Sequence, residues 1–318
     1  MPDPADLLDS LPHGERIRSR KLAGGVATVI ADATGLSKGD RDALERQLNA
    51  AALALPGVSE ARIAVTAAEP RRTLIAIGSG KGGVGKSTVA ANLAIALARA
   101  GKTVGLVDAD VYGPSQPTLL GSSAKPTAQD DRLIPVAAQG IKFLSLGHLV
   151  SPGHALAWRG PMATGALAKL IEAEWGSAEL LIVDLPPGTG DVQLSLIQRS
   201  RPAGAVIVST PQDLSLIDAR RAVDLFNKMS VPVLGIIENM ATYACPGCGA
   251  ESHPFGTGGA EAAAAELGVP FLGRLPLSPA IREASDAGRP PAASAGPEAE
   301  AFAALAAKLL ETLETPIH

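Results

Sequence analysis

The chain has 318 residues, of which 46% are hydrophobic and 19% are charged, and its formal net charge is −4. This composition is ordinary for a globular protein with a full core, so wholesale disorder is not expected. A weakly acidic chain without a strongly basic tract also argues against nonspecific nucleic-acid binding, which depends on neutralising phosphates.

The amino-terminal stretch MPDPADLLDS is acidic and lacks the basic and apolar regions of a secretory signal. No apolar run approaches the roughly 18 residues that a membrane-spanning helix needs. We therefore expect a cytoplasmic protein without a membrane segment.

Residues 1–68 are expected to form a small α+β domain of their own. Apolar alternation and helical spacing predict a strand, a helix and a strand, in that order, over residues 24–30, 37–54 and 61–66. Ser37 and Asp40 fit a capping box at the start of the helix. The stretch EPRRT, residues 69–73, is the expected linker into a second domain over residues 69–318.

From Thr73 onward, apolar strands alternate with helical segments, which is the signature of a mostly parallel sheet with helices on both faces. Strands are expected near residues 74–78, 103–107, 141–146, 180–184, 204–209, 231–237 and 270–273, and helices over 87–100, 163–175, 214–229, 258–267 and 298–313. Ligands of such sheets bind outside the carboxyl ends of the strands, so chemistry is expected there.

A glycine-rich loop, GSGKGGVGKST over residues 78–88, joins the first of these strands to its helix. It fits the pattern G-x-x-x-x-G-K-[ST], in which backbone N–H groups point at phosphate oxygens without obstruction from a Cβ. We expect Lys86 to hold the β- and γ-phosphates of ATP and Ser87 to offer its hydroxyl to Mg²⁺. The predicted nucleotide-binding residues of the loop are Gly80, Lys81, Gly82, Gly83, Val84, Gly85, Lys86, Ser87 and Thr88.

The loop carries a second lysine, Lys81, directly after Gly80. The form K-G-G-V-G-K-[ST] resembles the deviant Walker A motif of the MinD, ParA and nitrogenase-iron-protein group of P-loop ATPases. In that group the first lysine reaches across a dimer interface to the partner's nucleotide. The resemblance therefore implies a P-loop NTPase fold, a homodimer, and a catalytic role in trans for Lys81.

Two carboxylates, Asp108 and Asp110, follow the strand expected at residues 103–107 and precede a Gly-Pro turn. Carboxylates at the carboxyl end of a strand suit a switch segment next to Mg²⁺ and an attacking water. We expect this strand to neighbour the strand that leads into the glycine-rich loop. In the family resemblance, DADVYGPS is switch I, with Asp108 near the metal and Asp110 placing the water.

Asp184 ends the apolar strand expected at residues 180–184, and the turn PPGTGD follows it. An aspartate in this position is the Walker B pattern, which holds Mg²⁺ through water, and the turn behind it can move when the γ-phosphate leaves. Asp184 is therefore predicted as a catalytic and magnesium-binding residue.

Asn239 follows the strand expected at residues 231–237. Its side-chain amide can donate and accept hydrogen bonds on one planar group, as reading an adenine edge requires. The family resemblance makes Asn239 the adenine contact and places Pro276 on the other side of the base.

Cys245 and Cys248 are the two cysteines of the chain, and they lie in one phrase, CPGCG, in a loop rich in turn residues. In a reducing compartment this spacing indicates metal or redox chemistry before a structural disulfide. A tetrahedral zinc site within one chain needs two more ligands, for which His253 is a single nearby candidate. Two chains related by a two-fold axis would supply the four thiolates that a 4Fe-4S cluster takes. A redox pair, a zinc site and an inert pair stay open as alternatives.

In this order, the phrases KGGVGKST, DADVYGPS, WRGPM, DLPPGTGD, ENM and CPGCG resemble the Mrp family of P-loop ATPases, called ApbC in some bacteria, which are iron-sulfur cluster carriers. The resemblance implies a homodimer that binds and hydrolyses ATP with Mg²⁺, holds a bridging 4Fe-4S cluster on the paired cysteines, and passes it to apo-proteins. Residues 1–68 look like a shortened, cysteine-free form of an iron-sulfur-assembly accessory domain.

Other functions occur on the same fold. A MinD-like membrane ATPase needs a basic amphipathic helix at its carboxyl end, whereas residues 298–317 carry Lys308 as their only basic side chain. A ParA-like DNA segregator needs a basic surface, which a pI near 5.8 does not favour. A nitrogenase-reductase type of protein would carry its cluster cysteines singly and far apart. A positioning ATPase without a cluster and an ATP-independent cluster scaffold stay open as alternatives.

Overall fold

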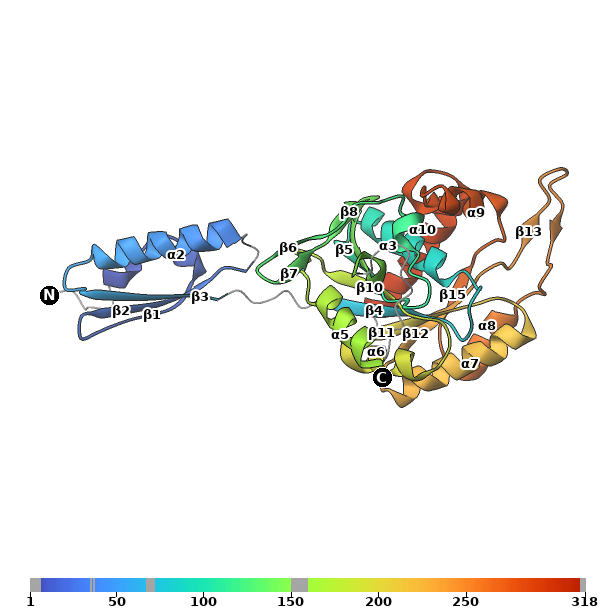
Figure 1. Cartoon of the computed structure of the whole chain (residues 1–318), viewed down its shortest axis with the longest axis horizontal. Helices are drawn as coiled ribbons and strands as arrows, with labels where there is room; N and C mark the ends of the chain where they lie inside the picture. Colours follow the sequence, from blue (N-terminus) through green and yellow to red (C-terminus); the bar gives the residue numbers. More distant parts are fainter. Residues whose placement is uncertain (1–6, 35, 37, 67–71, 150–159, 315–318) are drawn as a thin grey trace. The chain divides into compact units, whose positions relative to one another are not determined.

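The computed structural model describes residues 7–34, 36, 38–66, 72–149 and 160–314. By its internal contacts the chain divides into two compact units, Met1–Arg71 and Arg72–His318 (Figure 1). The domain boundary predicted between residues 68 and 69 stays a prediction. Parts of three sequence features lie outside the described residues, namely Ser37 of the capping box, residues 69–71 of the linker and Trp158-Arg159 of the WRGPM phrase.

The amino-terminal unit is a three-stranded sheet with one long helix. Strand β1 (Ile17–Ala23) pairs antiparallel with β2 (Val26–Asp32), and β2 pairs parallel with β3 (Glu60–Thr66) across helix α2 (Lys38–Leu53). The order β2–α2–β3 matches the predicted strand, helix and strand. The sequence does not predict β1, because this edge strand, IRSRKLA, is largely exposed and lacks apolar alternation.

The core of this unit lies between α2 and the sheet. Two short 3-10 helices, η1 (Leu8–Ser10) and η2 (Gly14–Arg16), precede β1, and η1 buries Leu8 in the core. Val29 of β2 and Leu48 of α2 are also fully buried there. The alternating burial along β2 follows from the two-residue period of a strand.

Among the described residues, eight strands form the central sheet of the carboxyl-terminal unit (Figure 1). Their spatial order is β15, β12, β11, β4, β10, β5, β9 and β8, and all neighbours are parallel except β8 and β9. The strands are β4 (Thr73–Gly78), β5 (Val104–Asp108), β8 (Val136–Ala138), β9 (Ile141–Ser145), β10 (Leu180–Asp184), β11 (Gly204–Ser209), β12 (Val233–Glu238) and β15 (Phe271–Arg274). The predicted mostly parallel sheet is confirmed.

Helices cover both faces of this sheet. Helices α3 (Lys86–Arg99) and α10 (Pro297–Glu314) pack on the face that includes Ile75 and Ile77 of β4. The opposite face, which includes Ala76, is covered by α5 (Gly160–Ile171), α6 (Asp191–Ser200), α7 (Asp213–Lys228) and α8 (Gly259–Leu267). Because both faces are buried, the strands read as continuous apolar runs. None of the helices in the described part of the chain combines the length and apolarity that a bilayer crossing requires.

Several elements of the carboxyl-terminal unit were not predicted from the sequence. Helix α6 alternates its apolar residues in the stretch DVQLSLIQ, a pattern that fits a strand as well as a helix. The others are short and are stabilised by packing more than by local propensity. They are α4 (Gln116–Leu119), α9 (Pro279–Asp286), η3 (Leu146–Leu149), η4 (Pro291–Ala293), strand β8, and the hairpins β6 (Thr127–Gln129) with β7 (Arg132–Ile134) and β13 (Tyr243–Ala244) with β14 (Glu251–Ser252).

The strand order corrects one expectation. Strand β10 lies between β4 and β5, so the strand that ends in Asp108 does not neighbour the strand that leads into the glycine-rich loop. That expectation is wrong because strands that follow one another in sequence are often, but not always, neighbours in a sheet. As a result, Asp184 at the end of β10 stands between the loop and Asp108.

Candidate functional site

Three adjacent strands end at the same edge of the central sheet, next to predicted site residues. Asp184 of β10 is in register with Ile77 of β4 on one side and with Asp108 of β5 on the other. The glycine-rich loop and the two carboxylates therefore meet at the carboxyl edge of the sheet, where ligands of parallel sheets bind.

The glycine-rich loop passes directly from β4 into α3. Gly83 and Gly85 both have φ of +81°, a left-handed conformation that glycine adopts without a Cβ penalty. Gly80 packs so closely on α7 that a Cβ would lie 2.0 Å from the Asp218 carbonyl oxygen. Helix α3 begins at Lys86, so its unpaired N–H groups and positive dipole end face the loop. The backbone alone can therefore hold an anion here.

Lys86 is buried and surrounded by oxygen atoms. Its Nζ lies 2.5 Å from Oδ1 of Asp184, 3.3 Å from Oγ of Ser87 and 3.6 Å from Oδ2 of Asp110. Burying a charge costs free energy unless the charge is paired, and these oxygens pair it. The arrangement is thus a cation position between the glycine-rich loop and two strand-end carboxylates.

Asp108 is fully buried and accepts three hydrogen bonds. Its Oδ2 accepts from the Ser145 hydroxyl at 2.8 Å and from the Gln116 N–H at 3.1 Å, and its Oδ1 accepts from the Asp110 N–H at 3.3 Å. Burial, together with the neighbouring Asp184 carboxylate, raises the pKa of Asp108 to about 7. The charged form of Asp108 is therefore disfavoured unless a cation lies nearby.

Asp110 lies in the DADVYGPS phrase, residues 108–115, which is called the switch segment below. Its Oδ1 accepts hydrogen bonds from the N–H groups of Tyr112 at 3.1 Å and Gly113 at 3.3 Å, while Oδ2 faces Lys86. The carboxylate lines the cavity above the loop, with 8% of the residue exposed. It is therefore held in place by the backbone and is still reachable from the cavity.

Sequence reasoning missed Gln116, which begins α4 directly after the DADVYGPS phrase. The residue is fully buried, and its Nε2 donates to Oδ2 of Asp184 at 2.9 Å and to the carbonyl oxygen of Ser87 at 3.0 Å. One amide thus links the glycine-rich loop, the switch segment and the strand that ends in Asp184. No sequence signal marks this glutamine, because its contacts arise only from the strand order.

A cavity of about 280 Å³ opens above these groups. This volume suits the phosphates of a nucleotide, since pockets that enclose whole drug-sized ligands are larger. Of the predicted loop residues, Gly80 packs on α7 and Val84 is buried, and the remaining seven line the cavity. The lining residues are Ser79, Lys81, Gly82, Gly83, Gly85, Lys86, Ser87, Thr88, Asp110, Ser115, Leu119 and Pro187.

Asn239 follows β12, and Pro276 follows the neighbouring strand β15. The Asn239 Nδ2 donates to the Val84 carbonyl oxygen at 2.8 Å, so this side chain holds the glycine-rich loop. A Cβ on Gly85 would lie 2.2 Å from the same Nδ2, so the close approach needs glycine. Leu275, which precedes Pro276, donates its N–H to the last carbonyl oxygen of β12 at 2.9 Å. The adenine contact stays a prediction for both residues.

Cys245 and Cys248 lie between β13 and β14, in a hairpin that projects from the body of the carboxyl-terminal unit (Figure 1, at the β13 label). Both thiols are free, with Cys245 half-buried and Cys248 exposed. The N–H groups of Gly247 and Cys248, and the Cys248 thiol, donate to the Cys245 sulfur and lower its pKa. The loop therefore favours the thiolate form of Cys245, which is the form of cysteine that binds metals.

His253 does not complete a metal site with these thiols. Its Nδ1 lies 3.2 Å from the Ala241 carbonyl oxygen, which can only accept, so Nδ1 donates there and Nε2 is the ring nitrogen left for a metal. Across the described residues, no three His, Cys, Asp or Glu side chains are grouped so as to hold a metal ion. The described part of one chain therefore offers the hairpin two thiolates.

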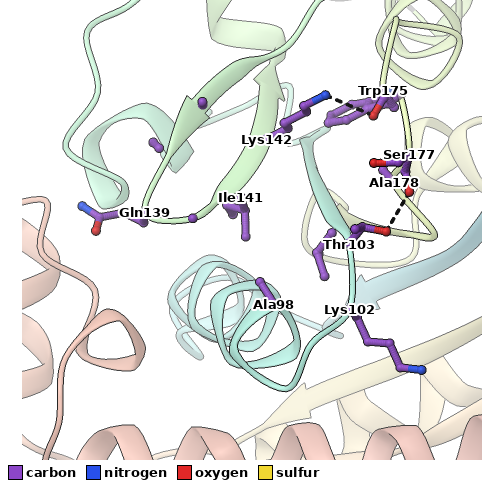
Figure 2. A pocket seen from close by; sticks show the side chains of 13 residues that line it. Ala98, Lys102, Thr103, Gln139, Ile141, Lys142, Trp175, Ser177 and Ala178 are labelled. Carbon is purple, nitrogen blue, oxygen red and sulfur yellow. Dashed lines mark hydrogen bonds between the residues drawn. The ribbon is translucent and has the colours of Figure 1, made fainter. Parts of the chain in front are cut away.

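A larger cavity, of about 590 Å³, lies at the opposite end of the strands (Figure 2). Its wall includes Ala98 at the end of α3 and Ile141 at the start of β9. The Lys142 ammonium donates to the Trp175 carbonyl oxygen at 3.4 Å, so it is already paired with backbone. None of the predicted site residues lines this cavity, so its size does not make it the candidate site.

Residues 71–310 match the family model described as ParA, NUBPL iron-transfer P-loop NTPase. The chain is 46% identical over 305 residues to the iron-sulfur cluster carrier protein of Deinococcus radiodurans. This alignment covers 92% of this chain and 86% of the Deinococcus protein. The nucleotide-binding protein of Archaeoglobus fulgidus, solved in complex with ADP, is similar with a TM-score of 0.62 and 40% identity, over 71% of this chain and 89% of that one.

The cell division ATPase MinD of Pyrococcus furiosus is a more distant structural neighbour, with a TM-score of 0.59 and 25% identity over 75% of this chain and 98% of that one. The two solved structures confirm the fold class predicted from the sequence. The alignment with the Deinococcus protein is longer than the unit Arg72–His318, so it extends into the amino-terminal unit as well.

Proposed function

The chain belongs to the ParA-like family of NUBPL-type iron-transfer P-loop NTPases, and from this membership we propose that it is an ATP-dependent iron-sulfur cluster carrier. In this proposal it binds and hydrolyses ATP with Mg²⁺, holds a 4Fe-4S cluster between two copies of the chain, and passes the cluster to apo-proteins in the cytoplasm. One observation carries the proposal: Asn239, after β12, contacts the glycine-rich loop, and the cysteine hairpin begins at Tyr243 on the same segment.

The oxygens around Lys86 support the magnesium part of the proposal. Oxygens of Ser87, Asp110 and Asp184 already surround an ammonium cation, and Mg²⁺ also prefers oxygen ligands. Ser87, Asp108 and Asp184 would hold the ion, directly or through water. When bound, it would neutralise charge on the phosphate oxygens.

The chain's own groups would do the rest of the hydrolysis. Lys86 would move from Asp184 to the β- and γ-phosphate oxygens. Asp110, fixed by two N–H groups, would orient the water that attacks the γ-phosphorus. A bond from the water oxygen to the γ-phosphorus would form as the bond from that phosphorus to the β,γ-bridging oxygen breaks, which yields ADP, phosphate and one proton released to solvent. Asn239 and Pro276 would contact the adenine.

Exposed apolar side chains beside the loop support a homodimer. Leu214 and Ile217 on α7 are 72% and 46% exposed, and α7 contacts the loop at Gly80. Tyr112, in the switch segment, is 72% exposed. Contiguous patches of exposed apolar side chains mark surfaces that bind other proteins, whereas single exposed side chains are common. We propose this surface as the dimer interface, across which Lys81 would reach the partner's nucleotide, and we expect a low hydrolysis rate without that partner.

The cargo would be a cluster shared by two chains. A 4Fe-4S cluster takes about four thiolates, and a two-fold interface is the simplest way to double the two that each chain offers. The exposed Cys248 would leave the cluster accessible to a client protein. Residues 1–68, which contain no cysteine, would act as an accessory docking domain.

Anaerobic reconstitution of the full chain with iron and sulfide tests this proposal. We expect the broad visible absorbance of a cluster and about four irons per dimer by iron analysis and sizing. Cys245→Ser and Cys248→Ser should each abolish the absorbance and leave ATP binding almost intact, whereas Ser252→Ala on the same hairpin should change neither.

Two outcomes would contradict it. Four irons per monomer, or serine variants that keep their iron, would exclude a bridging cluster on these cysteines. A chain that turns over ATP and takes up no cluster would instead favour a positioning ATPase of the MinD and ParA kind.

A further inference from the structure

The amide oxygen of Gln116, Oε1, has no hydrogen-bond partner in the described part of the chain, although the residue is fully buried. A buried acceptor without a donor destabilises a fold, and such atoms are uncommon in native structures. The other half of the same amide is fully used, since Nε2 donates to Asp184 and Ser87. This oxygen therefore needs an explanation.

Its neighbours fix which way the amide faces. The Asp184 carboxylate and the Ser87 carbonyl can only accept hydrogen bonds, so the NH₂ group of Gln116 must point at them. A flipped amide would bring three acceptors together. Because Nε2 and Oε1 belong to one planar group, the oxygen is held beside the same carboxylate and cannot turn elsewhere while those bonds persist.

Gln116 also touches every residue predicted to hold magnesium. Its side chain binds Asp184 and Ser87, and its backbone N–H donates to Oδ2 of Asp108 at 3.1 Å. Gln116 contacts these three residues but does not itself line the cavity. This is the arrangement of a residue that orients metal ligands, a class whose loss lowers metal affinity by about 10- to 100-fold.

We propose that Gln116 is a positioning residue for the magnesium ion of the proposed ATP site, and this inference rests on the proposed function. Its NH₂ group holds Asp184 and the Ser87 backbone, and its Oε1 is an unused acceptor that the hydration water of the ion would satisfy once Lys86 has moved to the phosphates. Because Gln116 begins α4, directly after the switch segment, magnesium binding would also stabilise that segment.

The test compares nucleotide binding with and without the metal. Gln116→Met keeps the length of the side chain and removes both the donor and the acceptor. We expect its affinity for a fluorescent methylanthraniloyl-ATP in EDTA to equal that of the wild type, while the half-saturating Mg²⁺ concentration rises about 10- to 100-fold. Excess Mg²⁺ should restore binding, and titration with Mn²⁺ followed by electron paramagnetic resonance should show the same loss directly.

Gln193→Met is the matched control. Gln193 lies in α6, is 1% exposed, and has no partner for either polar side-chain atom in the described part of the chain. This variant should keep the wild-type dependence on Mg²⁺. If Gln116→Met does not fold, Gln116→Asn retains a polar amide that is too short for both contacts, and it should shift the Mg²⁺ titration in the same direction by less.

Two results would overturn the inference alone. The first is a Mg²⁺ titration of Gln116→Met that coincides with that of the wild type. The second is a loss of nucleotide affinity that is as large in EDTA as in Mg²⁺, which would indicate a merely structural role. A wild-type chain whose nucleotide affinity does not respond to Mg²⁺ would instead overturn the proposed function, and the inference with it.

Discussion

Lys86 and Asp184 form an ion pair that a bound nucleotide would have to open. The Lys86 ammonium lies 2.5 Å from the Asp184 carboxylate, and both groups are buried. Phosphate would draw the lysine away, and the freed carboxylate could then serve a metal ion. The two side chains therefore stabilise each other in the ligand-free protein and would serve different ligands in the complex.

We expect Lys86→Ala to lower ATP turnover by at least about 100-fold, because it removes a charge placed against the phosphates, and Asp184→Asn to do nearly the same. Phosphate release is the measurement. Lys102→Ala, at a half-buried lysine that lines the cavity at the other end of the sheet, is the control and should turn over normally. Wild-type turnover in either site variant would refute the assignment.

Lys81→Ala tests whether Lys81 binds the phosphates of its own chain's nucleotide or acts on the nucleotide of the partner chain. Lys81 lines the cavity and is only partly buried. We expect its loss to spare much of the nucleotide affinity and to abolish hydrolysis. A fall in affinity as large as that of Lys86→Ala would mean that Lys81 acts on the nucleotide of its own chain.

Asp108 makes the stability of the ligand-free protein depend on pH. Burial, with a smaller contribution from the neighbouring Asp184 carboxylate, raises its pKa from an ordinary value of 3.8 to about 7 in the folded chain. Between these values the folded state keeps a proton that the unfolded state has lost, so the Asp108 contribution to the free energy of unfolding falls as pH rises. Above pH 7 that decline ends.

We therefore expect the wild type to lose stability relative to Asp108→Asn as pH rises from about 4 to 7, with no further divergence above 7. Urea unfolding of both proteins, without nucleotide or metal, at a series of pH values measures the difference. Parallel pH profiles for the two proteins would show that Asp108 ionises normally in the folded chain.

At the scale of elements, the glycine-rich loop is held between α7 and the end of β12. Gly80 lies against the Asp218 backbone on one side, and the Asn239 amide binds the Val84 carbonyl oxygen on the other. Both contacts require the loop backbone to approach a neighbour more closely than a Cβ allows. The shape of the loop therefore depends on elements far from it in sequence.

Gly80→Ala should disrupt this arrangement, because the new Cβ would fall 2.0 Å from a backbone oxygen that cannot move without shifting α7. We expect a loss of about 1–3 kcal/mol of stability from the overpacking and a marked loss of nucleotide affinity. Thermal unfolding and nucleotide titration are the measurements.

Gly165→Ala is the control for this substitution. Gly165 is exposed within α5, and a Cβ there would meet no atom within 4 Å. Alanine should stabilise that helix by about 0.5–1 kcal/mol and leave nucleotide binding unchanged. Equal behaviour of the two variants would show that the Gly80 contact does not constrain the loop.

At the scale of the whole molecule, the proposal requires two chains, and the exposed side chains of α7 are the place to test this. We expect Leu214→Asp or Ile217→Asp to weaken ATP-dependent dimerisation by roughly tenfold or more, because each would bury a charge at the interface. Sizing with ATP and Mg²⁺ is the measurement. Leu53→Asp, at a 49% exposed leucine of α2, is the control. A dimer indifferent to both α7 variants would exclude this interface.

The sequence determined those features that depend on neighbouring residues. Apolar runs and helical spacing predicted seven of the eight described strands of the central sheet, because both faces of a parallel sheet are buried and each strand reads as apolar. Two motifs are local in the same sense. The phosphate-binding loop that ends at Lys86 and Ser87 and the cysteine pair Cys245 and Cys248 each need fixed residue types only a few positions apart.

Which of these segments meet depends on the three-dimensional packing of the chain. Strand β10 inserts between β4 and β5, which puts Asp184 beside Asp108 and gives Gln116 its contacts with both. The Asn239 amide reaches the glycine-rich loop for the same kind of reason. Strand order and packing depend on contacts between residues far apart in the chain, and the periodicity of a single segment carries no information about them.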